Sequence, residues 1–248
     1  DASGRAILPY FRRRIAVDNK AKDGTFDPVT AADKAAERAI AKLITARFPD
    51  HGIVGEEFGN KRGDARFKWV IDPIDGTRSF VTGSPMWGTL IALMDGATPI
   101  LGLVDQPYTK ERFWSTEKAA HLRDASGKIR RMATRPCPKL ADAVLMTTHP
   151  DLFLPGLEAE AFQRIKPRVR MSRYGGDCYS YCLVAAGFVD LVIETGLKSY
   201  DIAAHIPLIE RAGGVVTDWD GGPAAEGGRV IAAGDPQLHK AVLKLIAG

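Results

Sequence analysis

Residues 69–77 read Trp69-Val70-Ile71-Asp72-Pro73-Ile74-Asp75-Gly76-Thr77, a short apolar run that leads into two carboxylates and a turn. The run predicts a strand, and Pro73 and Gly76 predict a sharp turn directly after it. An ionised carboxylate is not buried without a partner, and two converging carboxylates repel each other unless a cation lies between them. Asp72 and Asp75 therefore indicate a site for Mg²⁺, which prefers carboxylate oxygens together with substrate phosphate.

The same turn offers donors to a phosphate. Gly76 and Thr77 place backbone N–H groups where the chain bends, which is a natural cradle for phosphate oxygens. A purely structural alternative stays open, because Asp-Pro and Asp-Gly are common turn dipeptides. Either acid alone fits an Asx cap at the end of a strand.

Acidic residues stand at the edge of two further apolar segments. Glu56 and Glu57 follow Ile53-Val54, and Asp201 precedes a helix expected over residues 202–212. Taken singly, the two glutamates fit a solvated loop and Asp201 fits a helix N-cap. Strand ends and helix starts are also where α/β proteins build their sites, so the joint occurrence of these acids favours one shared site.

The composition is that of a globular protein with one large domain or two closely packed halves. The chain has 248 residues, of which 45% are hydrophobic, and a formal net charge of +4. It has no apolar stretch of about 18 residues, which excludes a transmembrane helix, and no secretory-signal layout. The first residue is Asp1, which leaves open whether a leader precedes it. The three cysteines favour a reducing, cytoplasmic compartment, and the slight positive charge does not demand nucleic acid.

The pattern of apolar residues changes along the chain. A helix over residues 31–48, with a capping-box-like start at Thr30 and Asp33, precedes a meander of short strands at 53–54, 69–71, 89–94, 100–104 and 112–115. The second half alternates strands at 143–147, 168–171, 191–193, 215–217 and 230–233 with helices at 156–165, 178–186, 202–212 and 236–246. This predicts an α+β half over residues 1–125 and a layered α/β half over residues 126–248.

The motifs resemble those of a known family. The segment 72–77 followed by Phe80 resembles the first signature of the inositol monophosphatase-like family of metal-dependent phosphatases. Tyr200-Asp201-Ile202-Ala203-Ala204, followed by residues 212–214, resembles the second, and the segments 55–57 and 27–33 also fit. Tyr200 departs from the Trp that the family more often has there. With residues 174–179 and 187–192, this makes the chain similar to the branch that hydrolyses histidinol phosphate.

The resemblance implies an α/β fold, a layered αβαβα sandwich with the site between the two halves, and a homodimer. It also implies Mg²⁺ and its ligands. One ion would be held by Glu56, Asp72 and the Ile74 carbonyl. A second ion would be held by Asp72, Asp75 and Asp201. Glu56 would help to hold a third, weaker ion through water. The four carboxylates carry about −4, which two Mg²⁺ ions neutralise, and a third ion would offset the roughly −2 of the phosphate.

Catalytic roles are implied in the same way. Thr77, paired with Asp33, would orient the attacking water and help to deprotonate it beside Glu56. The amides of Gly76 and Thr77 would bind the phosphate. The resulting activity is hydrolysis of a small-molecule phosphate ester, with neither nucleic acid nor a membrane as partner.

The substrate alcohol is chosen by other residues. In the family, the position of Glu194 faces the alcohol part of the substrate. Asp177 fits either a helix N-cap or a carboxylate that recognises an amine or imidazole, both of which histidinol phosphate carries. The sequence therefore favours histidinol phosphate in histidine biosynthesis. An inositol-1-phosphate or sugar-alcohol monophosphatase and a catalytically silent regulatory or nucleic-acid-binding relative are the alternatives.

Two other signals have structural interpretations. His205 lies four residues after Asp201, a zinc-like spacing, but no second soft ligand is evident, so a structural histidine is favoured. The basic run 164–173 alternates with Val169 and Met171, which fits a half-exposed strand better than a nucleic-acid surface.

Overall fold

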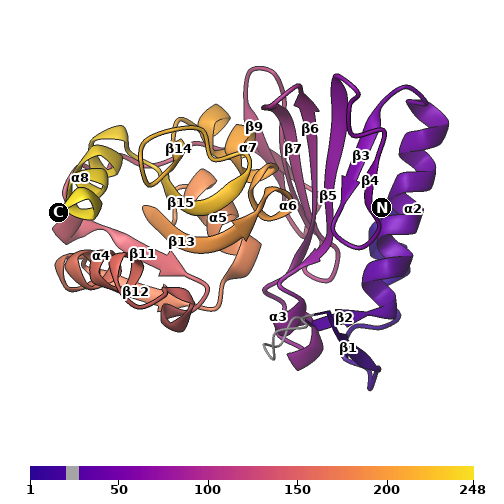
Figure 1. The fold of residues 1–248 in the computed structure, drawn as a ribbon, viewed down its shortest axis with the longest axis horizontal. Helices are drawn as coiled ribbons and strands as arrows, with labels where there is room; N and C mark the ends of the chain where they lie inside the picture. The colour runs from indigo at the N-terminus through magenta and orange to yellow at the C-terminus, as the bar shows by residue number, and fades with distance from the viewer. Residues whose placement is uncertain (21–27) are drawn as a thin grey trace.

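The computed structural model describes residues 1–20 and 28–248. Figure 1 shows helix α2 (Ala31–Arg47), with α1 (Ala2–Ile7) packed beside it, on the outer face of an eight-stranded sheet. Helices α5 (Asp177–Ala185), α6 (Ser199–Ile202) and α7 (His205–Ala212) form the next layer, against a five-stranded sheet. Helices α4 (Leu157–Ile165) and α8 (Pro236–Ala247) cover the far side of that sheet. This order confirms the predicted αβαβα sandwich.

The larger sheet has the strand order β10-β9-β8-β7-β6-β5-β3-β4. Its strands are β3 (Gly52–Gly55), β4 (Gly59–Lys61), β5 (Phe67–Asp75), β6 (Gly88–Asp95), β7 (Thr98–Gln106), β8 (Glu111–Ser115), β9 (Ala120–Arg123) and β10 (Ile129–Arg131). From β5 to β10 each strand pairs antiparallel with the next, which confirms the meander, whereas β3 runs parallel to β5. Strands β1 (Val17–Asn19) and β2 (Pro28–Thr30) form a separate antiparallel pair.

Strand β5 continues through the acidic turn to Asp75, whereas the apolar run predicted that it would end at Ile71. Asp72 lies opposite Leu90 and Asp75 lies opposite Gly88, so β5 has one residue more than β6 between these pairs. In a regular strand, residues three apart face opposite sides of the sheet. The extra residue is a bulge, and it lets both carboxylates face the same side.

The smaller sheet has the order β12-β11-β13-β15-β14. Its strands are β11 (Val144–Thr147), β12 (Met171–Tyr174), β13 (Leu191–Lys198), β14 (Val215–Asp218) and β15 (Gly227–Ala233), and short 3-10 turns are η1 (Leu140–Asp142), η2 (Pro150–Leu152) and η3 (Lys166–Arg168). Strand β11 runs parallel to β12 and β13, and β15 is antiparallel to both of its neighbours.

Two predicted elements were wrong in their bounds. The strand predicted at 168–171 begins only at Met171. Pro167 lies in the turn η3, and it has no backbone N–H to donate to a neighbouring strand. The helix predicted at 202–212 is two helices, α6 and α7. Pro207 has no N–H to donate to the Ala203 carbonyl, so a single helix is not continuous there.

The larger apolar core lies between the two sheets and includes Val70, Leu90, Cys182 and Val192, while a second core lies under α4 and α8. Strand β10 still belongs to the larger sheet, so the chain crosses to the smaller one after Arg131. The division into halves at 125/126 stays a prediction. Among the described residues, no helix has the length and apolar character needed to cross a bilayer. Asp27, part of the family-like segment 27–33, lies outside the described residues.

Candidate active site

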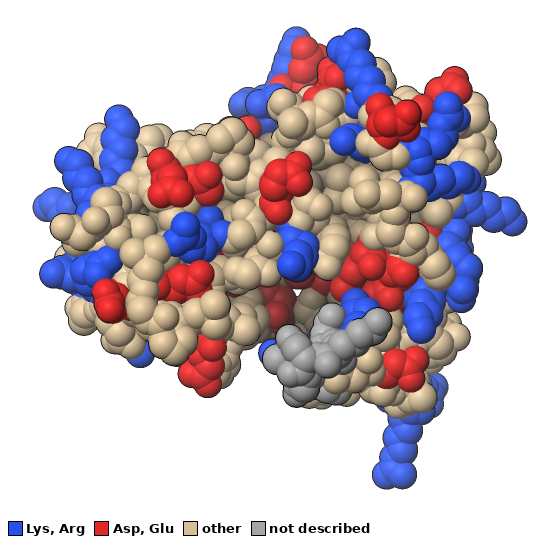
Figure 2. All heavy atoms as spheres, viewed as in Figure 1, with Lys and Arg blue, Asp and Glu red and all other residues tan. Residues whose placement is uncertain are grey.

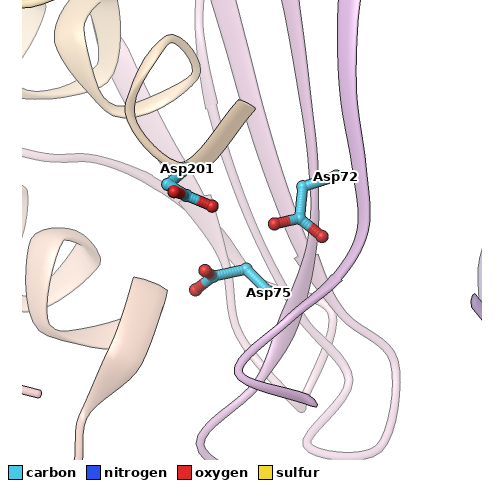
Figure 3. Close-up of side chains that lie close together, drawn as sticks. All are labelled: Asp72, Asp75 and Asp201. Atoms are coloured by element: carbon cyan, nitrogen blue, oxygen red, sulfur yellow. The ribbon is translucent and has the colours of Figure 1, made fainter. Parts of the chain in front are cut away.

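Three carboxylates from the two halves of the chain meet between the sheets. Oxygens of Asp72, Asp75 and Asp201 all lie within 4.8 Å of one another. Figure 3 shows the three side chains pointing toward one another, the first two from β5 and the third from α6. The bulged end of β5 supplies the carboxylates of Asp72 and Asp75, and α6 supplies the carboxylate of Asp201. The predicted convergence of these three acids is therefore present.

The electrostatics of the cluster call for a cation. Asp72 is only 2% exposed, and its Oδ1 atom has no hydrogen-bond partner among the described residues. Burial and the negative charges of Glu56, Asp75 and Asp201 raise the pKa of Asp72 well above its usual range. Burial also raises the pKa of Asp201, to about 7. Buried like charges and an unpartnered oxygen fit a divalent metal with oxygen ligands.

Glu56 lies at the edge of this cluster, directly after β3. Its carboxylate contacts the ammonium of Lys20, with 2.5 Å between Oε1 and Nζ, and Lys20 also reaches Glu57 at 3.0 Å. Burial raises the pKa of Glu56, and the charge of Lys20 opposes that shift. The backbone here is fixed by Glu37, which accepts hydrogen bonds from the N–H groups of Glu57 and Phe58. The role of Glu56 as a metal ligand stays a prediction.

The turn after β5 is tight and leads directly into a short helix, and its role in phosphate binding stays a prediction. Gly76 has φ of +83°, and a Cβ there would lie 2.7 Å from the Met86 carbonyl oxygen. Helix α3 (Thr77–Thr82) begins directly after it, and the first N–H groups of a helix have no acceptor inside the helix. Phe80 and Trp87 pack edge to face at 5.1 Å beneath this helix and hold it in place.

Thr77 and Asp33 are each partnered within their own segment. The Thr77 hydroxyl donates to the Ile74 carbonyl at 2.9 Å. Asp33, buried in the first turn of α2, accepts from the Thr30 N–H at 2.8 Å and from the Thr30 hydroxyl at 2.6 Å, which confirms the capping box. The pairing of Thr77 with Asp33 stays a prediction, as does the Ile74 carbonyl as a ligand.

A pocket of about 380 Å³ opens beside the cluster. Its lining comes from the end of β5, the segment between β11 and α4, the start of α4, helix α5, strand β13 and helix α6, and consists of Asp75, Thr148, Leu152, Leu154, Glu158, Asp177, Cys178, Tyr181, Glu194, Thr195, Gly196, Leu197 and Asp201. Both predicted substrate residues, Asp177 and Glu194, are in this wall. Figure 2 shows acidic atoms in the hollow between the two halves.

Asp177 is not the N-cap of α5. Gly176 holds that position, and the Asp177 carboxylate instead accepts a 2.6 Å hydrogen bond from the Ser79 hydroxyl. Its backbone has φ of +41°, an uncommon conformation for a residue with a Cβ. Burial raises the pKa of Asp177, while the Ser79 bond and the charge of Arg78 oppose the shift. The N-cap interpretation of this residue is therefore wrong, and its role in substrate recognition stays a prediction.

Glu194 lies within β13 rather than at its end, and its carboxylate is held by three hydrogen bonds. Oε1 accepts from the Thr148 N–H at 2.8 Å and from the Thr148 hydroxyl at 2.6 Å, and Oε2 accepts from the Tyr181 hydroxyl at 3.0 Å. Burial is the main cause that raises the pKa of Glu194.

Several residues of this site were not predicted from the sequence. Ser79, Thr148, Glu158, Tyr181 and Lys20 all contact or line it. One signal was available, because Tyr181 follows Asp177 by four residues and so shares a face of the same helix. The partners of Ser79 and Lys20 come from other elements, so no local pattern indicates them.

His205 has the structural role that was expected. The basic run 164–173, expected to be a half-exposed strand, instead spans the end of α4, the turn η3 and the start of β12. His205 is fully buried and stacks on Tyr181 at 4.6 Å, and burial lowers its pKa to about 3. Arg164 donates to the carbonyls of Leu245 and Ile246, which ties α4 to the end of α8.

The fold and the acidic cluster are those of the metal-dependent phosphatases that the motifs resemble. The chain belongs to the inositol monophosphatase family, whose model matches residues 1–247. Members are metal-dependent, typically with Mg²⁺, and the oxygen donors of the cluster fit that ion.

Individual relatives match almost the whole chain. The bifunctional phosphatase IMPL2, chloroplastic, of Arabidopsis thaliana is 46% identical over 255 residues, covering 98% of this chain and 71% of that protein. A histidinol-phosphatase of Mycobacterium tuberculosis is 35% identical over 224 residues, covering 89% and 85%. The solved structure of an inositol monophosphatase from Zymomonas mobilis aligns with a TM-score of 0.87 at 40% identity, covering 100% of this chain and 94% of that one.

Proposed function

We propose that this phosphatase is a Mg²⁺-dependent phosphate monoester hydrolase that acts on L-histidinol phosphate. One observation carries the choice of substrate. The pocket beside the metal cluster is lined by five carboxylates, and none of the described residues that line it is Lys, Arg or His. A pocket of about 380 Å³ suits a small molecule.

The charge of this pocket favours a cationic substrate. Two of its carboxylates, Asp75 and Asp201, belong to the metal cluster, which leaves Glu158, Asp177 and Glu194 to face the organic part of the substrate. These three would repel a second anion and attract an amine or an imidazolium. Histidinol phosphate carries both groups, whereas inositol phosphate offers neutral hydroxyls. Arg78 offsets part of the charge of Asp177 but leaves the other two uncompensated within the lining.

The division of labour follows from the positions of the residues. Bound Mg²⁺ supplies positive charge to the phosphate and lowers the pKa of the attacking water. Asp72, Asp75 and Asp201 would hold it, together with Glu56 and the Ile74 carbonyl. The Thr77 hydroxyl donates to Ile74, so its oxygen is free to accept a hydrogen bond from a water and orient it. The amides of Gly76 and Thr77 would bind the phosphate. For Asp33 to take up the proton, the Thr77 hydroxyl would have to donate to Asp33 in place of the Ile74 carbonyl while it accepts from the water.

Other parts of the assignment are supported only by the family resemblance. The name of the Mycobacterium relative favours histidinol phosphate, and the Zymomonas structure keeps inositol 1-phosphate as the alternative substrate. The assembled acidic cluster speaks against a catalytically silent relative. The homodimer, the third Mg²⁺ ion and the histidine-pathway role are proposals of the same kind.

The test is phosphate release from L-histidinol phosphate and from inositol 1-phosphate, measured side by side with Mg²⁺ and with EDTA. We expect kcat/KM to be at least about 100-fold higher for histidinol phosphate, since the amine and the imidazole each gain a charged partner. EDTA should abolish both activities. A preference for inositol 1-phosphate would overturn the substrate, and activity that resists EDTA would overturn the metal.

A further inference from the structure

Tyr181 lines the substrate pocket and is also bonded to a second residue of its wall. Its hydroxyl donates to Glu194 Oε2 at 3.0 Å, while Thr148 occupies Oε1 with two hydrogen bonds. Glu194 is 5% exposed and lines the pocket beside both donors, whose hydrogen bonds to its two oxygens fix the plane of the carboxylate. The second lone pair of Oε2 remains able to accept a donor from the pocket.

Glu194 needs such support because its surroundings are acidic. The charges of Asp75 and Asp201 lie close enough to interact with it, and Asp177 is among the causes that raise its pKa. Without a fixed donor, a carboxylate in this field would rotate away from its neighbours or take up a proton. Three hydrogen bonds from neutral groups oppose the rise of its pKa and hold the carboxylate in place.

Tyr181 is a rigid support for that hydrogen bond. It is 2% exposed, and its ring stacks on the His205 imidazole with an interplanar angle of 18°. Burial keeps the phenol protonated by raising its pKa, and burial keeps His205 neutral by lowering its pKa to about 3. The hydroxyl therefore donates, and no positive charge from the stack competes with the substrate.

We infer that Tyr181 is a positioning residue for substrate selectivity, which holds Glu194 so that this carboxylate receives the cationic group of the substrate. The inference rests on the proposed function, because it assumes a cationic substrate. It assigns no direct contact with the phosphate to Tyr181.

The chain offers a matched pair of variants. Tyr181→Phe removes the hydroxyl at Glu194 and keeps the ring against His205. Tyr179→Phe removes a hydroxyl two residues away on the same helix, where it donates at 2.6 Å to Glu111, which is not part of the pocket wall. Thr148→Val removes a different hydroxyl bonded to Glu194 and tests the same carboxylate from its other oxygen.

The readout is the ratio of kcat/KM for L-histidinol phosphate to that for phenyl phosphate, a neutral-alcohol ester. For Tyr181→Phe we expect this ratio to fall about 10-fold, chiefly through KM for histidinol phosphate, and to fall in the same direction for Thr148→Val. Tyr179→Phe should keep the wild-type ratio. Calorimetric titration of L-histidinol into the EDTA-treated protein gives a readout free of turnover, and its Kd should rise about 10-fold in Tyr181→Phe.

The outcomes separate the two claims. Suppose that the wild type prefers histidinol phosphate. The positioning role is then wrong, and the proposed function stands, if Tyr181→Phe keeps the wild-type ratio of kcat/KM values or if Tyr179→Phe lowers this ratio equally. If the wild type shows no preference between the two esters, the proposed substrate fails, and the assignment of Tyr181 fails with it.

Discussion

The carboxylate of Asp75 accepts a 2.7 Å hydrogen bond from the backbone N–H of Cys178, 103 residues further along the chain. This bond joins the acidic turn of β5 to the first turn of α5. Since a helix N-terminus favours negative charge, α5 steadies a carboxylate that its neighbours repel. Asp75 belongs both to the metal cluster and to the wall of the substrate pocket, so its displacement would affect both.

Asp75→Asn is expected to abolish turnover, with a loss of at least about 100-fold, and to weaken Mg²⁺ binding. The amide oxygen of Asn can still accept from Cys178, so the free energy of unfolding should change by no more than about 1 kcal/mol. Phosphate release, Mg²⁺ titration and thermal melts measure the three effects. Asp95→Asn is the control, since this carboxylate pairs with Arg66 on the surface. Retained hydrolysis in Asp75→Asn would remove the metal assignment.

The stability of the metal-free protein should fall as the pH rises from 5.5 to 8.5. The pKa of Asp201 is raised from 3.8 to about 7 in the fold, and those of Asp72 and Asp75 are also raised. A carboxyl group whose pKa is higher in the folded state than in the unfolded state binds its proton more tightly when the protein is folded. Its contribution to the free energy of unfolding is complete below the unfolded-state pKa and is lost as the pH rises through the folded-state pKa. For Asp201 alone the loss is on the order of 2 kcal/mol, or about 4–8 °C in Tm.

Saturating Mg²⁺ should remove most of this fall, because the ion stabilises the ionised carboxylates. Thermal melts in EDTA and in Mg²⁺ across the same pH range provide the measurement. Parallel Tm curves under the two conditions would contradict the buried, metal-binding cluster.

Asp177→Asn should lower kcat/KM for L-histidinol phosphate about 10-fold and that for inositol 1-phosphate by less. The amide can still accept from Ser79, so the substitution removes the charge and preserves the hydrogen bond. Steady-state kinetics with the two esters measure the effect. Asp151→Asn is a matched control, since that carboxylate lies beside the pocket wall at Leu152 but is 89% exposed. Equal losses on both esters would contradict a charge-based role.

Gly76→Ala should destabilise the fold by about 2 kcal/mol and reduce turnover strongly. Its Cβ would lie 2.7 Å from the Met86 carbonyl oxygen and 3.2 Å from the Asp177 Cβ, at a φ of +83°. Gly96→Ala has a similar φ of +60° with no atom within 4 Å, so it reports the backbone strain alone. Denaturant unfolding of both variants, with kinetics, separates the two effects. Similar losses in the two variants would mean that the close approach at Gly76 is unimportant.

Local patterns predicted most of the elements. The helix over 31–48 and the strand over 143–147 are found at Ala31–Arg47 and Val144–Thr147, because apolar periodicity and capping residues act within a few residues. The bounds were wrong where proline intervened, at the strand that begins at Met171 and at the break before His205. Short, mostly polar strands such as β4 and β10 were not predicted, since pairing with a neighbouring strand defines them rather than composition.

By itself the sequence determined the three acids that meet in the cluster, Asp72, Asp75 and Asp201, and the chemistry that they suit, since carboxylate type, turn residues and spacing are local properties. Only the tertiary structure decided how they meet. The bulge that turns Asp72 and Asp75 to one side depends on pairing with β6, and the approach of Asp201 depends on the packing of α6 against β5. The partners that fix Asp177 and Glu194, namely Ser79, Thr148 and Tyr181, are set by contacts between elements. Such contacts are selected by the packing of the whole core, which no short stretch of sequence specifies.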